Sequence, residues 1–371
     1  MESFIYEGKG MNFLNCHVSE KSIELVNQVL KSRKLSEGEM VKRFEEQLSK
    51  KLGLRNPVAV NSGTSALHLG LVLAGVKAGD EVILPAQTFI ATGMAVLMCG
   101  ATPVFADIDP LTGCICPESA GKLINTRAKA IIPVHWGGHV CDLEPLCYEE
   151  LIEDAAHSLG AVYKNTVIGK YSNFTAFSFQ STKLLNCGDG GALCCFQNKD
   201  CEEARKMRWF GIPREAKPDH LGERVYDVEE VGYKYHMNEV AAAIGLGNLE
   251  DFPQRWFRRQ EIARRYREGL EGVKGIRLMR VEPDRTHAYY FFSLLADRRD
   301  DLAKKLNGPF GTGGCASVVC RRIDRFKVFG GIREELKGQR EYDEHHLALP
   351  THEEVTDEQV ESIIRAIQEG W

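Results

Sequence analysis

The chain has 371 residues, of which 43% are hydrophobic and 27% are charged, with a formal net charge of -5. A chain of this length buries a large core and forms one large domain or two unequal ones. The slight acidic balance provides no polybasic surface for nucleic acid or anionic lipid, and the N-terminus lacks a basic region followed by an apolar one. We therefore expect a cytoplasmic globular protein with neither nucleic acid nor membrane as a partner.

The first segment, residues 19–52, has apolar residues at helical spacing and a polar break at 34–38, which predicts two lead-in helices. From residue 57 onward, short apolar strands alternate with helices. The expected strands are 58–60, 81–84, 102–105, 130–134, 151–154, 175–179 and 191–196, and the expected helices between them include 64–74 and 88–99. This alternation predicts an α/β fold with a mainly parallel sheet covered by helices.

The composition changes after about residue 250. An arginine-rich helix is expected at 255–267, a strand at 287–295 and a last helix at 357–367. We therefore expect a large domain at 1–250, which includes the lead-in helices, and a smaller C-terminal α+β domain at 251–371. The twelve cysteines of the chain show no Cys-x-x-Cys spacing, so we expect reduced thiols and no metal site.

Lys183 is the first candidate for chemistry. The segment Phe177–Lys183 leads from an apolar strand into a polar turn, and the sequence Gly-Asp-Gly-Gly follows at 188–191. A lysine attacks an aldehyde only as the neutral amine, and a partly desolvated pocket at the end of a strand favours that form. The ordinary alternative for any single lysine is a solvent-exposed position on a loop.

Asp154 ends the apolar strand that begins at Leu151. A carboxylate at this place can keep a pyridine nitrogen protonated, so that a cofactor ring accepts the electrons released when a Cα–H bond breaks. The alternative is that Asp154 caps the structure that follows, because aspartate is common at helix starts. Taken alone, the residue favours neither interpretation.

The turn Asn61–Leu67 joins a strand to a helix through small hydroxyl residues. Backbone N–H groups and the positive end of a helix dipole bind an anion at such a turn, although a Ser or Thr N-cap explains the same pattern. Downstream, Phe89 can stack on a flat ring, but a core phenylalanine is the simpler interpretation.

Together these blocks resemble the DegT/DnrJ/EryC1/StrS family, the sugar aminotransferases among the fold-type I pyridoxal 5′-phosphate (PLP) enzymes. The resemblance covers nearly the whole chain and rests on the order and spacing of blocks at 62–67, 79–83, 88–92, 153–158, 178–183, 188–191, 232–239 and 349–352. It implies a three-layer α/β/α fold of the aspartate aminotransferase type, PLP as cofactor, and a homodimer in which both subunits build each active site.

Carried over position by position, the resemblance makes Lys183 the amine that forms the Schiff base with PLP. It makes Asp154 the partner of the pyridine nitrogen, and it places Phe89 against one face of the ring. His157 would lie near the ring hydroxyl; without the family pattern, a structural histidine is the more common case.

The resemblance also implies the phosphate ligands of the cofactor, namely Thr64, Ser65 and Ser178. Lys234 lies in the block at 232–239, through which a neighbouring subunit reaches the phosphate in this family. Many relatives have asparagine there, so Lys234 is a departure from the pattern. A lysine can still bind phosphate as a point charge.

The resemblance implies a reaction that transfers an amino group from glutamate or glutamine to a keto sugar, namely a nucleotide-linked keto-deoxysugar, for a surface polysaccharide or an antibiotic. Two alternatives are a PLP-dependent sugar dehydratase and a non-catalytic regulator with the same fold. Relatives that act as dehydratases typically replace the lysine by histidine, so Lys183 argues against the first. Lys183 and Asp154 together argue against the second.

Overall fold

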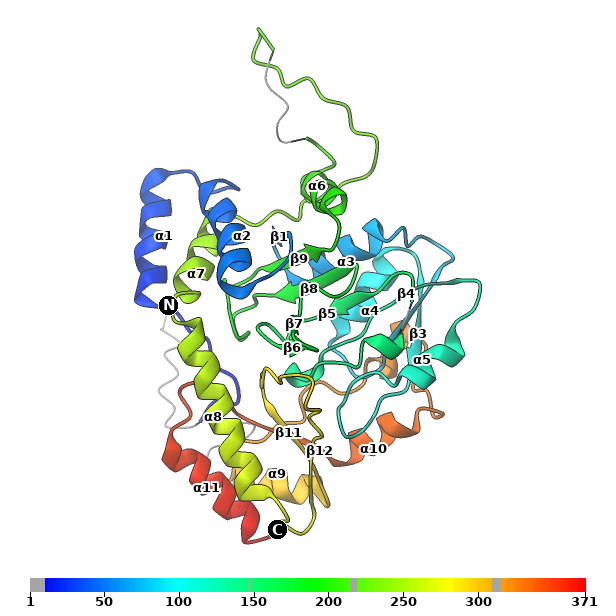
Figure 1. The fold of residues 1–371 in the computed structure, drawn as a ribbon, viewed down its shortest axis with the longest axis vertical. Coiled ribbons are helices and arrows are strands. Elements are labelled where there is room, and N and C mark those ends of the chain that lie inside the picture. The colour runs from blue at the N-terminus through cyan, green and yellow to red at the C-terminus, as the bar shows by residue number, and fades with distance from the viewer. Residues whose placement is uncertain (1–10, 147, 214–218, 309–314) are drawn as a thin grey trace.

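The computed structural model describes residues 11–371 except 147, 214–218 and 309–314 (Figure 1). The α-helices are α1 (Glu20–Ser32), α2 (Glu39–Leu52), α3 (Gly63–Leu73), α4 (Ile90–Met98), α5 (Pro117–Leu123), α6 (Asn198–Met207), α7 (Glu239–Asn248), α8 (Phe252–Leu270), α9 (Arg299–Asn307), α10 (Lys337–His345) and α11 (Asp357–Gln368). The strands are β1 (Pro57–Val60), β2 (Glu81–Pro85), β3 (Thr102–Ala106), β4 (Ala128–Ile131), β5 (Ile152–Asp154), β6 (Val162–Tyr163), β7 (Thr166–Val167), β8 (Phe174–Ser178), β9 (Gly191–Cys195), β10 (Ile276–Leu278), β11 (Phe292–Ala296) and β12 (His346–Leu349). Short 3-10 turns lie at Trp136–Gly138, Glu144–Leu146, Ile323–Arg325 and Lys327–Phe329.

The central sheet has two parts, with strand orders β1-β9-β8-β5 and β3-β2-β4. Isolated parallel bridges from Ile131 to Leu151 and from Val134 to Asp154 join the two parts. β9 runs antiparallel to β1 and β8, whereas β5 pairs with β8, and β2 with β3 and β4, in parallel. The predicted α/β fold with a mainly parallel sheet is therefore confirmed, with one reversed strand.

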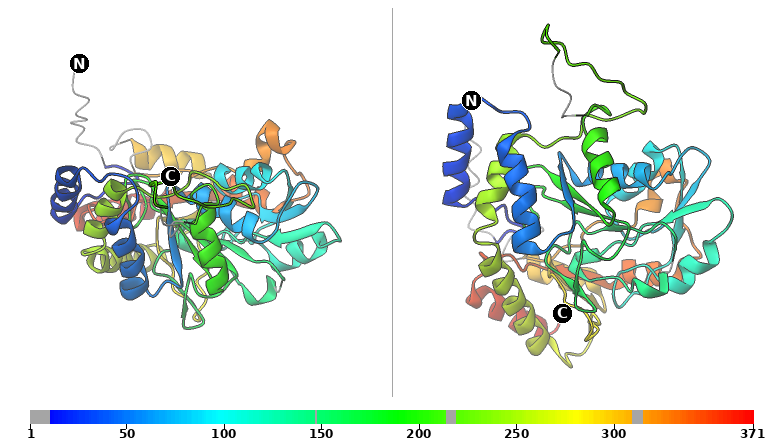
Figure 2. Two further views of the ribbon diagram at one scale, coloured as in Figure 1. Left: turned by 90° about the horizontal axis from the view of Figure 1, so that it is seen from above. Right: turned by 45° about the horizontal axis from the view of Figure 1, so that its top comes forward.

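The sheet is enclosed by helices. Every residue of β1, β2 and β9 is buried, as expected of strands covered on both faces. α3 packs on β8 and β9, and α1, α2 and α7 lie side by side at one flank of the molecule (Figure 1 and Figure 2). Within the described ranges, no helix is long and apolar enough to cross a membrane.

A second, smaller unit contains the antiparallel sheet β10-β11-β12 and the helices α8, α9 and α11. Many of its apolar side chains form a separate core, which includes Tyr266, Leu294, Leu347 and Ile363, whereas Leu295 and Ala348 belong to the core of the large unit. A distinct core of this kind supports the division near residue 250 that the change of composition predicts. The division itself stays a prediction, because α8 also contacts the large unit through Arg255, which donates to the carbonyl of Leu184.

The strand predicted at 287–295 is wrong at its start, since β11 begins at Phe292. The backbone N–H groups of Ala288 and Tyr290 donate to the carbonyls of Gly138 and Gly137, and Tyr289 between them has a φ of 47°. These contacts tie the segment to the loop after β4 instead of to a strand. They bring Tyr290 to the end of the central sheet.

α1 crosses α7 at Gly247, and this contact yields a stability prediction. A Cβ atom at Gly247 would lie 2.2 Å from the backbone nitrogen of Ser22. We expect Gly247→Ala to lower the free energy of unfolding by about 1–3 kcal/mol, because the two backbones must separate. The matched control is Gly121→Ala in α5, where an added Cβ meets no atom within 4 Å. Alanine should stabilise that helix by about 0.5–1 kcal/mol. Equal denaturation midpoints for the two variants would contradict the prediction.

Candidate active site

A cavity of about 420 Å³ lies where several strands of the central sheet end. Asp154 ends β5, Ser178 ends β8, and Thr64 and Phe89 follow β1 and β2. Ligands of open α/β sheets bind at the carboxyl ends of the strands, so the cavity has the expected place. A larger hollow of about 820 Å³ lies elsewhere and is lined by none of the predicted site residues.

The structure brings most of the predicted site residues together. The cavity is lined by Thr64, Phe89, Asp154, His157, Ser178 and Lys183. Ser65 and Lys234 do not line it. The Ser65 hydroxyl donates to the side-chain oxygen of Asn61 at 2.6 Å, and the Lys234 amine lies 4.3 Å from the centre of the Trp209 ring.

Asp154 is a buried carboxylate at the floor of the cavity. Its Oδ2 accepts a hydrogen bond from Thr92 Oγ1 at 2.7 Å, and its Oδ1 accepts one from the Ala156 N–H at 3.2 Å. Burial raises the pKa of Asp154 above its ordinary value, although Thr92, Ala156 and the positive charge of Lys183 act in the opposite direction. A carboxyl group in this state favours a ligand that brings a positively charged N–H group.

The residue before Asp154 points to the other side of the strand, because successive side chains of a strand alternate. The carboxylate of Glu153 is fully buried and lies 2.7 Å from Nε2 of His135, which is also fully buried. Glu153 accepts a further hydrogen bond from Thr175 Oγ1 at 2.9 Å. The pair connects β5 to β8 and to the segment after β4, and so fixes the strand end that carries Asp154.

Lys183 lies in a tight turn after β8, where its N–H donates to the carbonyl of Gln180 at 2.8 Å. Its amine is 4.7 Å from the centre of the Tyr290 ring. The Tyr290 hydroxyl is 2.9 Å from Thr182 Oγ1, so the tyrosine holds both the turn and the amine. Lys183 does lie on a loop, as the alternative interpretation of this residue assumed, but its side chain lines the cavity.

The His157 ring stacks on the Tyr290 ring, with the two ring centres 4.3 Å apart and an angle of 18° between the ring planes. Burial, together with the charge of Lys183, holds the pKa of His157 well below its ordinary value, so the imidazole is neutral. Nδ1 accepts a hydrogen bond from the Gly137 N–H at 3.3 Å, which assigns the proton to Nε2. A neutral imidazole of this form donates to an oxygen of a bound ring.

The N-terminus of α3 forms one end of the cavity. Ser62 Oγ caps the helix by accepting from the Ser65 N–H at 3.0 Å, so the capping interpretation of this turn is correct. Anion binding is compatible with it, because the side chains of Thr64 and Ser178 still line the cavity. Gly63 permits this approach, since a Cβ there would lie 2.8 Å from the Ser178 Cβ.

These groups fit PLP. One cavity holds an amine for an aldehyde, a buried carboxyl for a pyridine nitrogen, and a hydroxyl-lined helix N-terminus for a phosphate. Phe89 is 56% exposed in the lining of the cavity, where it offers a free aromatic face. The core alternative for Phe89 is therefore wrong.

Sequence reasoning missed Tyr290 and Thr92. Tyr290 lies 108 residues from its partner Thr182, in the segment 287–295 for which the sequence predicts a strand. Thr92 lies in the block at 88–92 and on the first turn of α4. It follows Thr88 by four residues, a spacing at which two side chains on a helical turn can meet, and the two hydroxyl groups are in contact.

The fold and the site together define a PLP-dependent enzyme of fold type I. A model of the DegT/DnrJ/EryC1/StrS aminotransferase family matches residues 17–368, and the chain belongs to this family. The family predicted from the sequence blocks is therefore confirmed, and with it the aminotransferase class and the PLP cofactor.

Similar proteins cover almost all of the chain. The spore coat polysaccharide biosynthesis protein SpsC of Bacillus subtilis is 32% identical over 95% of both chains. The GDP-perosamine synthase of Caulobacter vibrioides is 30% identical over 90% of this chain and 91% of its own. Among solved structures, the sugar aminotransferase CalS13 of Micromonospora echinospora has a TM-score of 0.91 at 29% identity, covering 97% of this chain and 100% of its own. The PLP form of Spr1654 of Streptococcus pneumoniae has a TM-score of 0.88 at 25% identity, covering 97% and 98%.

Proposed function

We propose that this PLP-dependent aminotransferase transfers an amino group from glutamate or glutamine to a nucleotide-linked keto-deoxysugar, in the biosynthesis of an amino sugar. The observation that carries the proposal is the single cavity shared by Lys183, Asp154 and the N-terminus of α3. The sugar acceptor is supported by the relatives that act on sugars, CalS13 and the GDP-perosamine synthase. A surface polysaccharide as destination is supported by SpsC.

When bound, PLP supplies an aldehyde and a ring that accepts electrons. In the proposal, Nζ of Lys183 would hold PLP through its aldehyde and, as a free amine, would take the proton from Cα of the amino donor. The carboxylate of Asp154 holds a proton on the pyridine nitrogen. Thr64 and Ser178 bind the phosphate together with the N–H groups at the start of α3.

His157 and Phe89 orient the ring in this proposal. Nε2 of His157 donates a hydrogen bond to the ring hydroxyl, and the neutral state of the imidazole suits that role. Phe89 covers one face of the ring and excludes water from it. Ser65 acts through the turn, because its hydroxyl is already bonded to Asn61.

The test of the proposal uses the purified holoenzyme with glutamate or glutamine as donor and a panel of nucleotide-linked keto sugars. We expect continuous release of the donor's oxo acid only when a keto sugar is present, and mass spectrometry should find a product that has exchanged oxygen for an amino group. A product that has lost a hydroxyl group without gaining nitrogen would indicate a dehydratase. A holoenzyme that yields no oxo acid with any keto sugar contradicts the proposed acceptor.

Two copies of the chain form the active unit in this proposal. Residues 219–231, between α6 and α7, extend away from the rest of the molecule (Figure 1). They carry strongly exposed apolar side chains, with Leu221 and Val231 each 78% exposed. Exposed apolar surface of this kind marks a protein interface. Lys234 lies at the base of this segment, outside the cavity of its own chain, and in the proposal it reaches the phosphate in the other subunit.

Mixed dimers test this arrangement. We expect Lys234→Ala to weaken PLP binding, because a charged phosphate contact is lost. When Lys234→Ala and Lys183→Ala subunits are co-expressed, the heterodimer has one site with Lys183 from one chain and Lys234 from the other. That site should bind PLP and turn over like the wild type, whereas the Lys183→Ala homodimer should be inactive and the Lys234→Ala homodimer should bind PLP weakly. No recovery in isolated heterodimers would mean that Lys234 acts within its own chain or not at all.

A further inference from the structure

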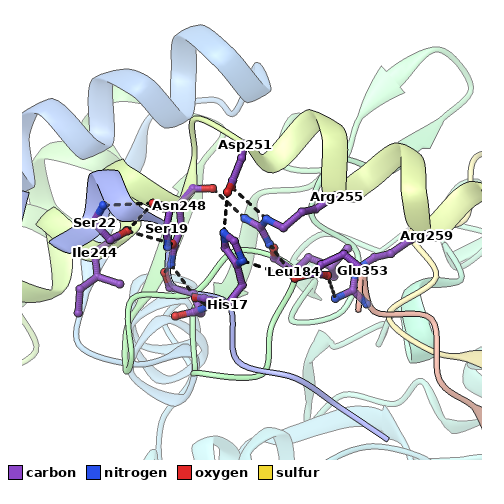
Figure 3. A network of polar contacts seen from close by, with 11 residues as sticks. His17, Ser19, Ser22, Leu184, Ile244, Asn248, Asp251, Arg255, Arg259 and Glu353 are labelled. Carbon is purple, nitrogen blue, oxygen red and sulfur yellow. Dashed lines mark hydrogen bonds and ion pairs between the residues drawn. The ribbon is translucent and has the colours of Figure 1, made fainter. Parts of the chain in front are cut away.

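One helix, α8, binds the backbone next to Lys183 and the backbone of Tyr290, whose ring lies 4.7 Å from the Lys183 amine. Figure 3 shows Arg255 and Arg259 of this helix with Leu184 and Glu353. Arg255 Nη1 donates to the carbonyl of Leu184 at 2.7 Å, and Leu184 directly follows Lys183. One helical turn later, Arg259 Nη1 donates to the carbonyl of Tyr290 at 3.3 Å. The spacing between the amine and the Tyr290 ring therefore depends on two arginines of the same helix.

Glu353 joins the two arginines. Its Oε2 lies 3.2 Å from Arg259 Nη2, and its Oε1 lies 4.0 Å from Arg255 Nη1. Burial alone would raise the pKa of Glu353, but the charge of Arg259, a backbone hydrogen bond and the charges of Arg255 and His17 together lower it. Arg255 and Arg259 are only 6% and 3% exposed, so both require a partner inside the protein. Glu353 is the partner of Arg259, and for Arg255 it adds a second carboxylate to the nearer one of Asp251.

The N-terminal segment completes the network, as Figure 3 shows. His17 Nε2 lies 2.6 Å from Oδ2 of Asp251, whose Oδ1 accepts from Arg255 Nε at 3.0 Å. The His17 carbonyl accepts from Asn186 Nδ2 at 2.8 Å, three residues after Lys183. Segments far apart in the sequence are thus tied together directly behind the site.

We propose that Glu353, acting through Arg255 and Arg259, is a positioning residue that fixes the Lys183 amine relative to Tyr290 and so to the bound cofactor. None of the three side chains lines the cavity. They act by holding two backbone carbonyls, and a shift of about 1 Å in a reacting group can cost about 100-fold in rate. This inference rests on the proposed role of Lys183.

The same helix offers a matched control. Asp357 bridges Arg258 and Arg265 of α8, with both nitrogen–oxygen distances at 2.8 Å. This second bridge also joins two arginines of α8 to one carboxylate, but it holds no backbone next to Lys183. Asp357→Asn should therefore leave the site unchanged, whereas Glu353→Gln should change it.

The experiment compares Glu353→Gln and Asp357→Asn as holoenzymes, below their unfolding temperatures. We expect Glu353→Gln to alter the visible circular dichroism of bound PLP, which reports its orientation, and to lower kcat by up to about 100-fold with little change in KM. Asp357→Asn should match the wild type in both measurements. Identical dichroism and kcat for the two variants would overturn the proposal.

Glu353→Gln leaves two buried arginines with less compensation and can fail to fold. In that case Arg259→Lys tests the proposal instead. The lysine keeps a positive charge beside Glu353, but it cannot also donate to the Tyr290 carbonyl in the same geometry. It should show the same change in dichroism and kcat, and wild-type values would overturn the proposal. Lys183→Ala separates the two assumptions: if that variant keeps its visible PLP absorbance, the assignment of Lys183 fails, whatever Glu353 does.

Discussion

Lys183→Ala is expected to lose the visible absorbance of the bound cofactor and to lower turnover by at least about 10²–10⁴-fold, the usual contribution of one acid–base group. The reason is that no other described lysine lines the cavity, so no amine replaces Nζ as the bonding group and as the acceptor of the Cα proton. Absorbance spectroscopy of the purified protein and a single-turnover assay with the amino donor measure the two effects.

Lys183→Arg is the control for charge. Arginine keeps a cation above the Tyr290 ring, a contact worth about 0.5–1 kcal/mol, but it provides no neutral amine. Both variants should therefore be inactive while their unfolding temperatures stay close to that of the wild type. If Lys183→Arg keeps the absorbance band or normal turnover, Lys183 is not the bonding residue and the proposed function loses its basis.

The sequence was sufficient for the part of the site that follows strand ends. Asp154 ends an apolar strand, Thr64 and Lys183 follow short polar turns after two others, and the carboxyl ends of parallel strands meet at one edge of a sheet. That rule alone brings the three residues together. The strand order was not predictable in the same way, because an apolar run looks the same in both directions. The reversed direction of β9 follows from its hydrogen bonds with β1 and β8.

The residues that support the site were harder to predict. Tyr290 reaches the cavity only because its backbone is bonded to Gly137, and no local pattern encodes a contact across such a distance in the sequence. Glu353 is similar, since its partners lie on α8, nearly one hundred residues earlier. Ser65 was predicted from its residue type, since a serine hydroxyl suits a phosphate. Its hydroxyl instead donates to the side-chain oxygen of Asn61, four residues earlier. Long-range packing decides which polar groups remain available to a ligand.

Asp154→Asn is expected to lower the turnover of the holoenzyme and to raise the stability of the cofactor-free protein. With PLP bound, the amide cannot hold the proton on the pyridine nitrogen, so kcat should fall by about 10²–10³-fold, as when one preorganised electrostatic group is removed from an active site. The variant keeps the shape of the side chain, and its amide can still contact Thr92 and Ala156. The loss should therefore appear in kcat without a rearrangement of the cavity.

Without PLP, the same change should stabilise the protein. Burial raises the pKa of Asp154 from its ordinary 3.8, so between the two values the folded state binds more protons than the unfolded state. Stability therefore falls as the pH rises through this range, and the loss is complete above the raised pKa. Asparagine has no such ionisation. Thermal unfolding of the cofactor-free proteins should show the variant above the wild type at neutral pH, with the difference disappearing towards pH 3.8. A variant that is less stable at neutral pH would show that the Asp154 charge is already compensated before the cofactor binds.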